Sequence, residues 1–382
     1  MKRKTFKYRI YPNKSQTKQL NSAINACRFV WNNFLGERKN LYETEKKSIS
    51  KFDQMNRLPE MKKEFPFLKD AYSQSLQHIG TTLDLAFRAF FQRIKKGEAP
   101  GYPRFKGVNR LSSINFPQYG CGCKISSGNL AVSKIGDIRM IYHRELIGTP
   151  KTARIKRTAT GKWFVTIVCE YDPETLPVNF KSVGIDLGIS KFATLSDGKV
   201  IENPRFLKVE EEELKKAQSK TDKLKKGSVE RRKARKVVNR IYERLSWKRE
   251  NFTHQESRKI VNEYQNIFLE KLDISSMVED NEFKLSKSIL DVAWNQFTSM
   301  IKYKAEEAGR NIVFVNPRNT SKMCSRCGIV VEKPLSQRTH SCKCGLIMDR
   351  DLNAAINILR LGTQSLKPPT LRQGSVHEQN EK

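Results

Sequence analysis

The N-terminal 96 residues begin with a strand-like pattern and continue with helical ones. Phe6, Tyr8 and Ile10 alternate with polar positions, which predicts a strand over residues 4–11 that ends at Pro12. Ser15 is expected to cap the helix that follows. Two apolar stripes at helical spacing come next: Leu20, Ile24, Cys27, Trp31 and Phe34, and then Leu76, Ile79, Leu83, Ala86 and Phe90. Residues 97–103 break the pattern, so we expect a helical block that ends there.

Residues 112–172 have the pattern of β-structure. Alternating apolar positions at Trp163, Val165, Ile167 and Cys169 predict one strand, and residues 126–128 and 158–161 have the composition of hairpin turns. The strand at residues 1–11 is expected to pair with this region. The preceding helical block would then be an insertion in a β-domain.

The rest of the chain alternates between strands and helices. We expect strands at 183–187, 267–270 and 311–315, a hairpin over 192–201, a long basic helical stretch over 208–264 interrupted near 227–228, and helices at 289–308 and 352–361. Residues 362–382 show no periodicity, so the sequence predicts a disordered tail there. The predicted fold class is therefore multidomain α/β.

Charge narrows the class of function. The chain has 382 residues with 72 Lys and Arg against 40 Asp and Glu, a formal net charge of +32. Such a surface attracts phosphate polymers, because neutralising phosphates releases condensed counterions. An ordinary metabolic enzyme is a poor fit to this charge. A hydrophobic fraction of 38% also excludes a basic disordered tail as the whole molecule.

The sequence predicts a cytoplasmic protein without a membrane segment. It has no run of about 18 apolar residues, and no signal-peptide core follows the basic N-terminus. Thiols stay reduced in that compartment, so the eight cysteines are expected to be free or to bind metal.

Three acids stand at the ends of predicted elements. Asp186 ends the first strand of the third region, Glu270 ends a later strand, and Asp351 opens the last helix. This order of elements fits an RNase H-like domain, in which such carboxylates converge. Converging carboxylates repel one another unless a cation neutralises them, and two Mg²⁺ ions suit phosphodiester hydrolysis. Salt bridges to the many basic residues are the alternative for each acid, and Asp349 is the rival of Asp351.

Four cysteines form two close pairs. Cys324 and Cys327 make a Cys-x-x-Cys pair, and Cys342 and Cys344 follow with one residue between them. Four thiolates at this spacing predict one structural Zn²⁺ with no open coordination position. His340 is a weaker candidate as a substitute ligand. Cys121 and Cys123 lack a second pair, so a turn is the simpler interpretation.

Basic and aromatic residues suggest nucleic-acid contacts. The long basic stretch runs through several cations that could contact phosphates: Arg231, Arg232, Lys233, Arg235 and Lys236. A solvated helix face is the alternative. Residues that could stack on or hydrogen-bond to nucleic acid are Arg9, Tyr11, Arg28, Trp31 and Asn32, with Arg104 and Lys106 further along.

These motifs together resemble TnpB proteins, which are transposon-encoded, RNA-guided DNA nucleases related to type V CRISPR effectors. The N-terminal signature is Tyr8-Arg9-Ile10-Tyr11-Pro12 with Gln16, followed by Cys27-Arg28-Phe29-Val30-Trp31-Asn32 and by Gly101-Tyr102-Pro103-Arg104-Phe105-Lys106. Gly184-Ile185-Asp186-Leu187-Gly188, Leu269-Glu270-Lys271-Leu272 and Asp349-Arg350-Asp351-Leu352-Asn353-Ala354-Ala355-Ile356-Asn357-Ile358 resemble the three RuvC motifs, whose last catalytic Asp matches Asp351. Asn319-Thr320-Ser321-Lys322-Met323-Cys324 and its partner cysteines resemble the zinc-bearing insert.

The resemblance implies a division into four kinds of domain. These are a wedge β-barrel at 1–11 and 112–178, a helical recognition insertion at 12–111, a RuvC-like nuclease at 179–316 and 347–361, and a zinc-binding target-nucleic-acid-binding insert at 317–346, before a tail at 362–382. It also implies a guide RNA from the transposon end and a double-stranded DNA target beside a short motif, with a monomer on the RNA and a prokaryotic, nucleoid-associated setting. Asn251 departs from the family, which usually has Asp before Phe252.

Two other functions compete with guided cleavage. A guide-dependent DNA-binding repressor would have lost RuvC acids, whereas this sequence keeps all three. A DNA strand-transferase is possible because RNase H-like domains also serve transposases. The helical insertion and the cysteine cluster argue against that reading.

Overall fold

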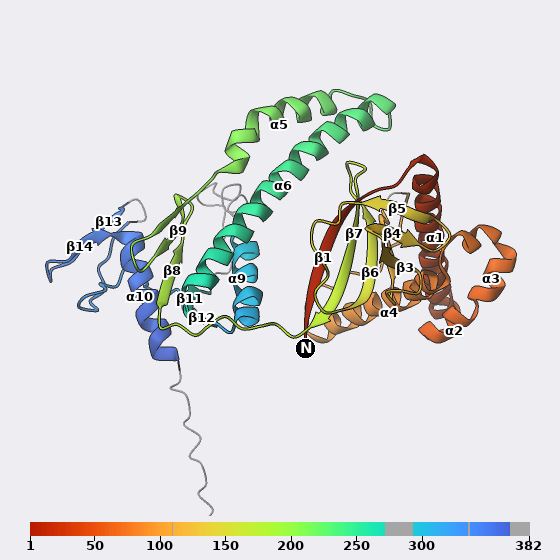
Figure 1. Cartoon of the computed structure of the whole chain (residues 1–382). Helices are drawn as coiled ribbons and strands as arrows, with labels where there is room; N and C mark the ends of the chain where they lie inside the picture. The colour runs from red at the N-terminus through yellow and green to blue at the C-terminus, as the bar shows by residue number, and fades with distance from the viewer. Residues whose placement is uncertain (109, 272–292, 335–336, 367–382) are drawn as a thin grey trace, which may run out of the picture. The chain divides into compact units, whose positions relative to one another are not determined.

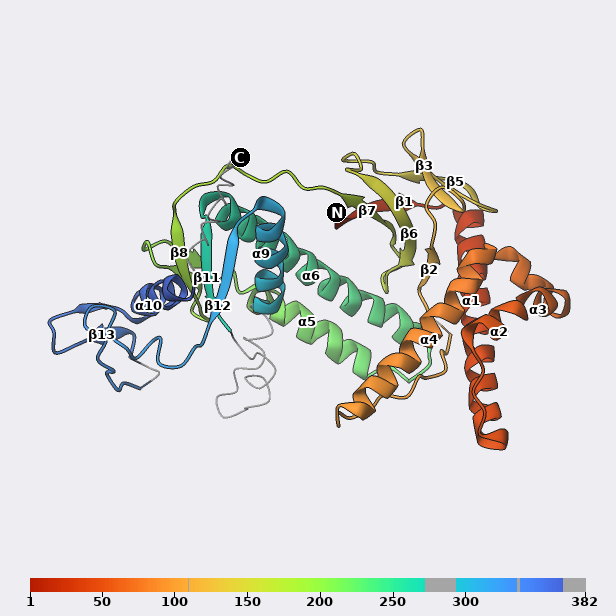
Figure 2. The same cartoon turned by 90° about the horizontal axis from the view of Figure 1, so that it is seen from below.

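The chain folds into two compact units that we describe separately. The computed structural model describes residues 1–108, 110–271, 293–334 and 337–366. The first unit spans Met1–Asp172 and the second Pro173–Lys382. Both combine helices with a sheet, which confirms the α/β class (Figures 1 and 2).

The first unit is built on a seven-stranded sheet that curves into a nearly closed barrel (Figure 1). Its strands are β1 (Lys2–Tyr11), β2 (Ser113–Phe116), β3 (Cys123–Ser126), β4 (Asn129–Val132), β5 (Gly136–Met140), β6 (Thr149–Arg157) and β7 (Trp163–Tyr171), in the order β2-β6-β7-β1-β5-β4-β3. Strand β1 pairs antiparallel with β7 along its length and with β5 at its end. The expected pairing of the first strand with the later β-region is confirmed.

A helical block lies between β1 and β2 in the chain. It consists of α1 (Lys14–Glu45), α2 (Lys51–Asn56), α3 (Leu58–Glu64), the 3₁₀ helix η1 (Pro66–Asp70) and α4 (Ser73–Lys95). The cap of α1 is Asn13, not Ser15 as expected. Asn13 Oδ1 accepts from the Gln16 backbone N–H and Gln16 Oε1 accepts from that of Asn13, a reciprocal capping box that leaves Ser15 inside the first turn.

One hydrophobic core joins the barrel to this block. Phe6, Tyr8 and Ile10 point inward from β1 and are fully buried, while the alternate positions face outward. On α1, Trp31 and Phe34 belong to the same buried cluster. The inserted helices therefore complete the barrel's core rather than forming one of their own.

The second unit has a five-stranded sheet of mixed direction. Its strands are β8 (Ser182–Leu187), β9 (Lys191–Leu195), β10 (Val200–Glu202), β11 (Asn266–Glu270) and β12 (Asn311–Val315), in the order β10-β9-β8-β11-β12. Strands β8, β11 and β12 are parallel, and β8 is central as the RNase H-like reading expected. The helices within the described residues of this unit are α5 (Phe206–Asp222), α6 (Val229–Glu263), α9 (Trp294–Ala308) and α10 (Arg350–Ser365). A small hairpin, β13 (Thr339–Ser341) and β14 (Ile347–Asp349), precedes α10.

The last helix is longer than the sequence pattern indicated. We expected it to end at residue 361, but α10 continues to Ser365. Residues 362–365, which we had placed in the disordered tail, are therefore helical. The remainder of the predicted tail, residues 367–382, lies outside the described residues, as do residues 289–292 of the helix expected at 289–308, which is described from Trp294. Within the described residues, no helix is both long and apolar enough to cross a membrane.

Two glycines allow α10 to pack closely on the sheet. A Cβ atom on Gly184 of β8 would clash with the Ala355 carbonyl oxygen and the Leu359 N–H group of α10. Gly362 of α10 lies against the ring of Phe268 on β11 in the same way. The helix backbone can thus rest on the two central strands, with Ile358 and Phe268 buried in the contact.

We predict that Gly184→Ala destabilises the second unit by about 1–3 kcal/mol, the usual cost of overpacking, because the added methyl meets backbone atoms that cannot rotate away. Denaturant unfolding of the full chain measures this. Gly107→Ala is the control, since Gly107 lies outside any helix or strand and its Cβ would meet nothing closer than Arg110 at 4.0 Å. Equal stability of the two variants would show that α10 is not held by this contact.

Candidate functional site

Two of the predicted acids lie side by side at one end of the second sheet. Leu269 of β11 pairs with Ile185 of β8 in parallel register, so the next residues, Glu270 and Asp186, are neighbours across the two strands. Adjacent strands are about 4.8 Å apart. Both acids are partly buried.

The third acid comes from the first turn of α10. Asp351 Oδ1 accepts hydrogen bonds from Nε and Nη2 of Arg350, both at 3.2 Å, and Arg338 Nη1 lies 3.8 Å from Asp351 Oδ2. The packing of α10 on β8 brings this carboxylate close enough to Asp186 for the two to repel.

Asp349 has a different role from its rival Asp351. Its Oδ1 accepts hydrogen bonds from the backbone N–H groups of Asp351 (2.9 Å) and Leu352 (3.1 Å), which makes it the N-cap of α10. Its Oδ2 pairs with Lys191 Nζ at 3.0 Å. Although burial opposes the effect, the Lys191 hydrogen bond holds the pKa of Asp349 below its usual value. Both of its oxygens therefore support the helix end.

The electrostatics of the three-acid site favour a bound cation. Burial raises the pKa of Asp186 well above its usual value, and repulsion by Glu270 and Asp351 adds to this. Burial also raises the pKa of Glu270, although the hydrogen bond from Thr320 acts to lower it. A folded state that holds these protons more tightly than the unfolded chain loses stability as pH rises above about 4. A hard divalent cation would remove that penalty, so these carboxylates fit Mg²⁺.

Side chains that the sequence analysis did not single out support this site. The buried Thr320 hydroxyl donates to Glu270 Oε1. From α10, the buried amide of Asn357 donates to the carbonyls of Thr320 and Met323, and Asn353 also donates to Met323. Asn353 and Asn357 stand one turn apart within an apolar helical stretch, which is the signal that could have revealed them.

The four clustered cysteines have the geometry of a tetrahedral thiolate site. The Sγ atoms of Cys324 and Cys344 are 3.6 Å apart, and those of Cys327 and Cys342 are 3.5 Å apart. A Zn–S bond of 2.3 Å in a tetrahedron implies S···S separations of about 3.8 Å. All four lie within 4.8 Å of one another, and among the described residues no other group of three or more His, Cys, Asp or Glu side chains is as close. The cluster could therefore hold a metal ion, whereas the three acids are not gathered as tightly.

His340 lies outside this set of four, although the sequence left it open as a ligand. It is fully buried, and Lys333 Nζ is 2.6 Å from its Nδ1 atom. The Cys121 and Cys123 pair also lacks metal-site geometry, because Cys121 is exposed while Cys123 is buried in the core of the first unit.

Three of the N-terminal candidates for nucleic-acid contact form hydrogen bonds within their own chain. The Trp31 indole donates to the Arg104 carbonyl at 3.1 Å. Asn32 makes two hydrogen bonds with the backbone of Lys106, at 2.8 and 3.0 Å, and Arg28 donates to the same carbonyl at 3.4 Å. Lys106 Nζ lies 3.5 Å from the centre of the Trp31 ring. These residues therefore fasten residues 104–106 to α1.

The outer face of the barrel carries the other N-terminal candidates. The Arg9 guanidinium lies 5.0 Å from the centres of both the Tyr11 and the Phe164 rings, and it donates to the Trp163 carbonyl. Tyr11 is 45% exposed, so it presents an aromatic surface whose neighbouring cation is already fixed in place.

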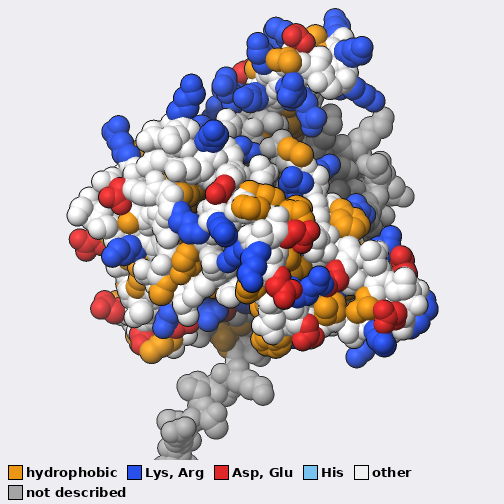
Figure 3. Space-filling view, turned by 90° about the vertical axis from the view of Figure 1, so that its right-hand side faces the viewer, with side chains coloured by type: hydrophobic (Ala, Val, Ile, Leu, Met, Phe, Trp, Pro, Cys, Tyr) orange, Lys and Arg blue, Asp and Glu red, His pale blue; other side chains and the backbone are white. Residues whose placement is uncertain are grey.

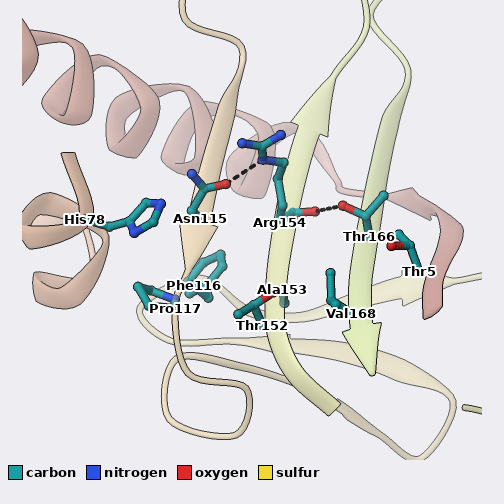
Figure 4. Close-up of a pocket in the computed structure, with 10 residues that line it drawn as sticks. All are labelled: Thr5, His78, Asn115, Phe116, Pro117, Thr152, Ala153, Arg154, Thr166 and Val168. Carbon is teal, nitrogen blue, oxygen red and sulfur yellow. Dashed lines mark hydrogen bonds between the residues drawn. The ribbon is translucent and has the colours of Figure 1, made fainter. Parts of the chain in front are cut away.

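A hollow of about 470 Å³ lies on the same sheet, beside α4 (Figure 4). Thr5, Thr152 and Thr166 line the hollow from the strands of the sheet. At one side, Arg154 Nε donates a hydrogen bond to Asn115 Oδ1 at 2.6 Å. The His78 ring faces this pair from α4. Burial, with Arg154 nearby, lowers the pKa of His78. The hollow thus offers hydroxyl, amide and guanidinium groups without an acid.

The basic candidates on α6 divide into two groups. Arg231, Arg232 and Arg235 line a second hollow, of about 360 Å³, at the start of the helix, where Arg231 Nη1 donates to the Leu224 carbonyl. Lys233 and Lys236 are exposed and do not line it.

Basic side chains also spread across the face of the molecule in Figure 3, with apolar side chains between them.

Three family models match successive parts of the chain. Residues 1–47 match a model described as a helix-turn-helix domain, residues 166–281 one described as "Probable transposase", and residues 294–358 one described as "Cas12f1-like, TNB domain". In the structure, residues 1–47 form a strand and one long helix, so this segment has no helix-turn-helix geometry.

Curated relatives cover nearly the whole chain. A proposed RNA-guided DNA endonuclease of Streptomyces pristinaespiralis is 34% identical over 94% of this chain and 89% of its own length. A similarly named protein of Escherichia coli K12, InsQ, is 29% identical over 95% of this chain and 93% of its own. Among solved structures, the mini-RNA-guided endonuclease CRISPR-Cas_phi3 aligns with a TM-score of 0.49 at 11% identity, covering 94% of this chain and 92% of that one.

Proposed function

Because the chain belongs to the TnpB family, we propose that it is an RNA-guided endonuclease that cuts double-stranded DNA. The observation that carries this proposal is the meeting of Asp186, Glu270 and Asp351 at one end of the second sheet. A guide-dependent repressor would not need three converging acids whose mutual repulsion destabilises the fold.

The three acids are proposed to hold the catalytic metal. Two Mg²⁺ ions at this position would activate a water molecule and stabilise the leaving oxygen of a phosphodiester. The chain's own residues set the positions: Thr320 orients Glu270, and Arg350 holds Asp351. The second unit is accordingly proposed to be a RuvC-like nuclease.

The cysteine cluster is proposed to bind one structural Zn²⁺. Four thiolates fill a tetrahedral shell, so no position remains for water or substrate. The hairpin β13–β14 contains part of the cluster and ends where α10 begins. Zinc would thus stabilise the insert from which the helix bearing Asp351 starts.

Sequence specificity is proposed to come from a guide RNA. A positive surface gives affinity for any nucleic acid but no sequence information. Base pairing with a guide supplies that information, and the protein then reads only a short motif beside the target. The barrel is proposed to be the wedge domain and the inserted helices the recognition domain. The hollow beside His78 and the cations of α6 are candidate contacts. The working form is proposed to be a monomer on its RNA in a prokaryotic cytoplasm.

A DNA strand-transferase is the second candidate, because one of the matched family models is described as a transposase. Joined DNA products in a reaction containing only this protein would favour it. The cysteine cluster and the inserted helical block favour guided cutting instead.

We predict that the RNA recovered with the protein directs its cutting. Sequencing that RNA, replacing its guide segment and mapping the cleavage sites should show cuts that move with the guide and stay beside one short motif. Without RNA, the net charge of +32 should give indiscriminate DNA binding that weakens steeply with salt. Cuts that stay in place when the guide changes would exclude RNA guidance.

Replacing any one of Asp186, Glu270 or Asp351 with Ala should reduce cutting by at least a hundredfold while guided DNA binding stays within a few-fold. Asp349→Ala should cost mainly stability, about 1 kcal/mol for a lost N-cap, with a smaller effect on cutting. Cleavage and gel-shift assays on the same preparations separate the two effects. Parallel loss of binding in the triad variants would mean that these acids support the fold.

Removing zinc should unfold the insert locally, because binding to such a site contributes directly to folding free energy. We expect one equivalent of zinc by elemental analysis, and loss of it in Cys324→Ser together with faster proteolysis near residues 320–350. Cys121→Ser is the matched control and should retain the metal, since Cys121 is exposed and outside the cluster. Protein purified without chelator that contains no zinc would contradict the assignment.

A further inference from the structure

The C-terminal end of α4 carries apolar residues that the first unit covers only in part, with Ala86 and Phe87 packed against its core. In its first half, Leu76, Ile79 and Leu83 are buried. After Leu83 the helix has no buried residue, and Phe91 is 55% exposed. Exposed apolar clusters of this kind commonly mark binding surfaces.

Four rings form an ordered group at this end, which we call the α4 aromatic cluster: Phe87, Phe90, Phe91 and Tyr102. The Tyr102 ring stands edge-on to Phe87 (centroids 5.6 Å apart, 89°) and to Phe90 (5.3 Å, 84°). Phe91 lies 5.2 Å from Phe90 and 6.4 Å from Phe87. Tyr102 lies two residues before the segment 104–106 that Trp31 and Asn32 fasten to α1, so its ring is held near α4 before any partner binds.

The segment that carries the cluster is rich in cations. Residues 84–106 contain six basic residues and two acids, Asp84 and Glu98, and Asp84 pairs with Arg88 at 3.0 Å. The basic residues are Arg88, Arg93, Lys95, Lys96, Arg104 and Lys106. A protein partner or a second copy of the chain would favour an apolar centre from which charges are depleted. The exposed rings of Phe91 and Tyr102, beside this excess of cations, instead match a partner with flat apolar faces on a phosphate backbone.

We propose that the α4 aromatic cluster stacks unpaired bases of the bound RNA. In a duplex the faces of the bases are stacked on one another, so only unpaired nucleotides can stack on these rings. The inference rests on the proposed function, because it takes RNA as the partner. Target DNA is double-stranded until the guide pairs with it, whereas an RNA carries unpaired segments from the start.

Photocrosslinking of the intact complex tests this. The protein is purified with its RNA from cells fed 4-thiouridine, which labels RNA and not DNA, and adducts are mapped after irradiation. We expect a uridine adduct on a peptide containing Phe90, Phe91 or Tyr102. Adducts elsewhere on the chain with none on these residues would overturn the proposal.

Variants separate stacking from charge. Phe91→Leu keeps an apolar side chain but removes the ring, so RNA should dissociate about tenfold faster with an unchanged salt dependence. Lys95→Ala, one turn away, should weaken the salt dependence and keep the adduct. If Phe91→Leu leaves RNA release unchanged, the cluster does not stack RNA and the proposal is wrong. If the variant halves the particle mass in light scattering, the cluster joins two copies of the chain instead. Guide-directed cutting is scored separately, so either result leaves the test of the main proposal intact.

Discussion

The close contact between α10 and the central strands is the constraint on which the second unit depends. Its helix backbone can approach β8 because Gly184 has no side chain there, and it passes Phe268 at Gly362 for the same reason. Only at this separation does the first turn of α10 carry Asp351 to the sheet end where Asp186 and Glu270 lie. A wider helix–sheet spacing would leave two acids on the sheet and the third out of range.

The packing of α10 on the sheet also brings side chains from outside the sheet into hydrogen bonds around the site. Thr320 bonds to Glu270, and the amides of Asn353 and Asn357 bond to carbonyls between residues 320 and 323. The loop before the cysteine cluster is therefore tied both to the sheet acid and to the helix. Because Asp186 has an elevated pKa and repelling neighbours, this scaffold holds carboxylates together against their electrostatic preference.

The sequence predicted elements and chemistry well where the pattern was local. Alternation at Phe6, Tyr8 and Ile10 and the spacing of the four cysteines both correspond to what the structure contains. Spacing alone did not distinguish Asp349 from Asp351, because the choice depends on which carboxylate caps the helix and which faces β8, and only the resemblance to the third RuvC motif favoured Asp351. Nor could periodicity show that Trp31 and Asn32 hold residues 104–106, a contact across more than 70 positions. The sequence pattern continues the apolar stripe of Leu76, Ile79 and Leu83 to Phe90, but Leu83 is the last fully buried residue of α4. Periodicity cannot show this, because burial depends on which other elements pack against the helix.

The junction between β14 and α10 has no linker. The strand ends at Asp349 and the helix begins at Arg350, so the last strand of the hairpin leads directly into the turn that carries Asp351. An α-helix rotates about 100° per residue, so a single inserted or deleted residue here would turn Asp351 away from the sheet. Loops away from these contacts can change length at little cost, because the entropy of closing a loop grows slowly with its length. Between residues 349 and 351 the length of the chain is fixed. An alignment of related sequences should therefore show gaps on the N-terminal side of the boundary between β14 and α10 and none across it.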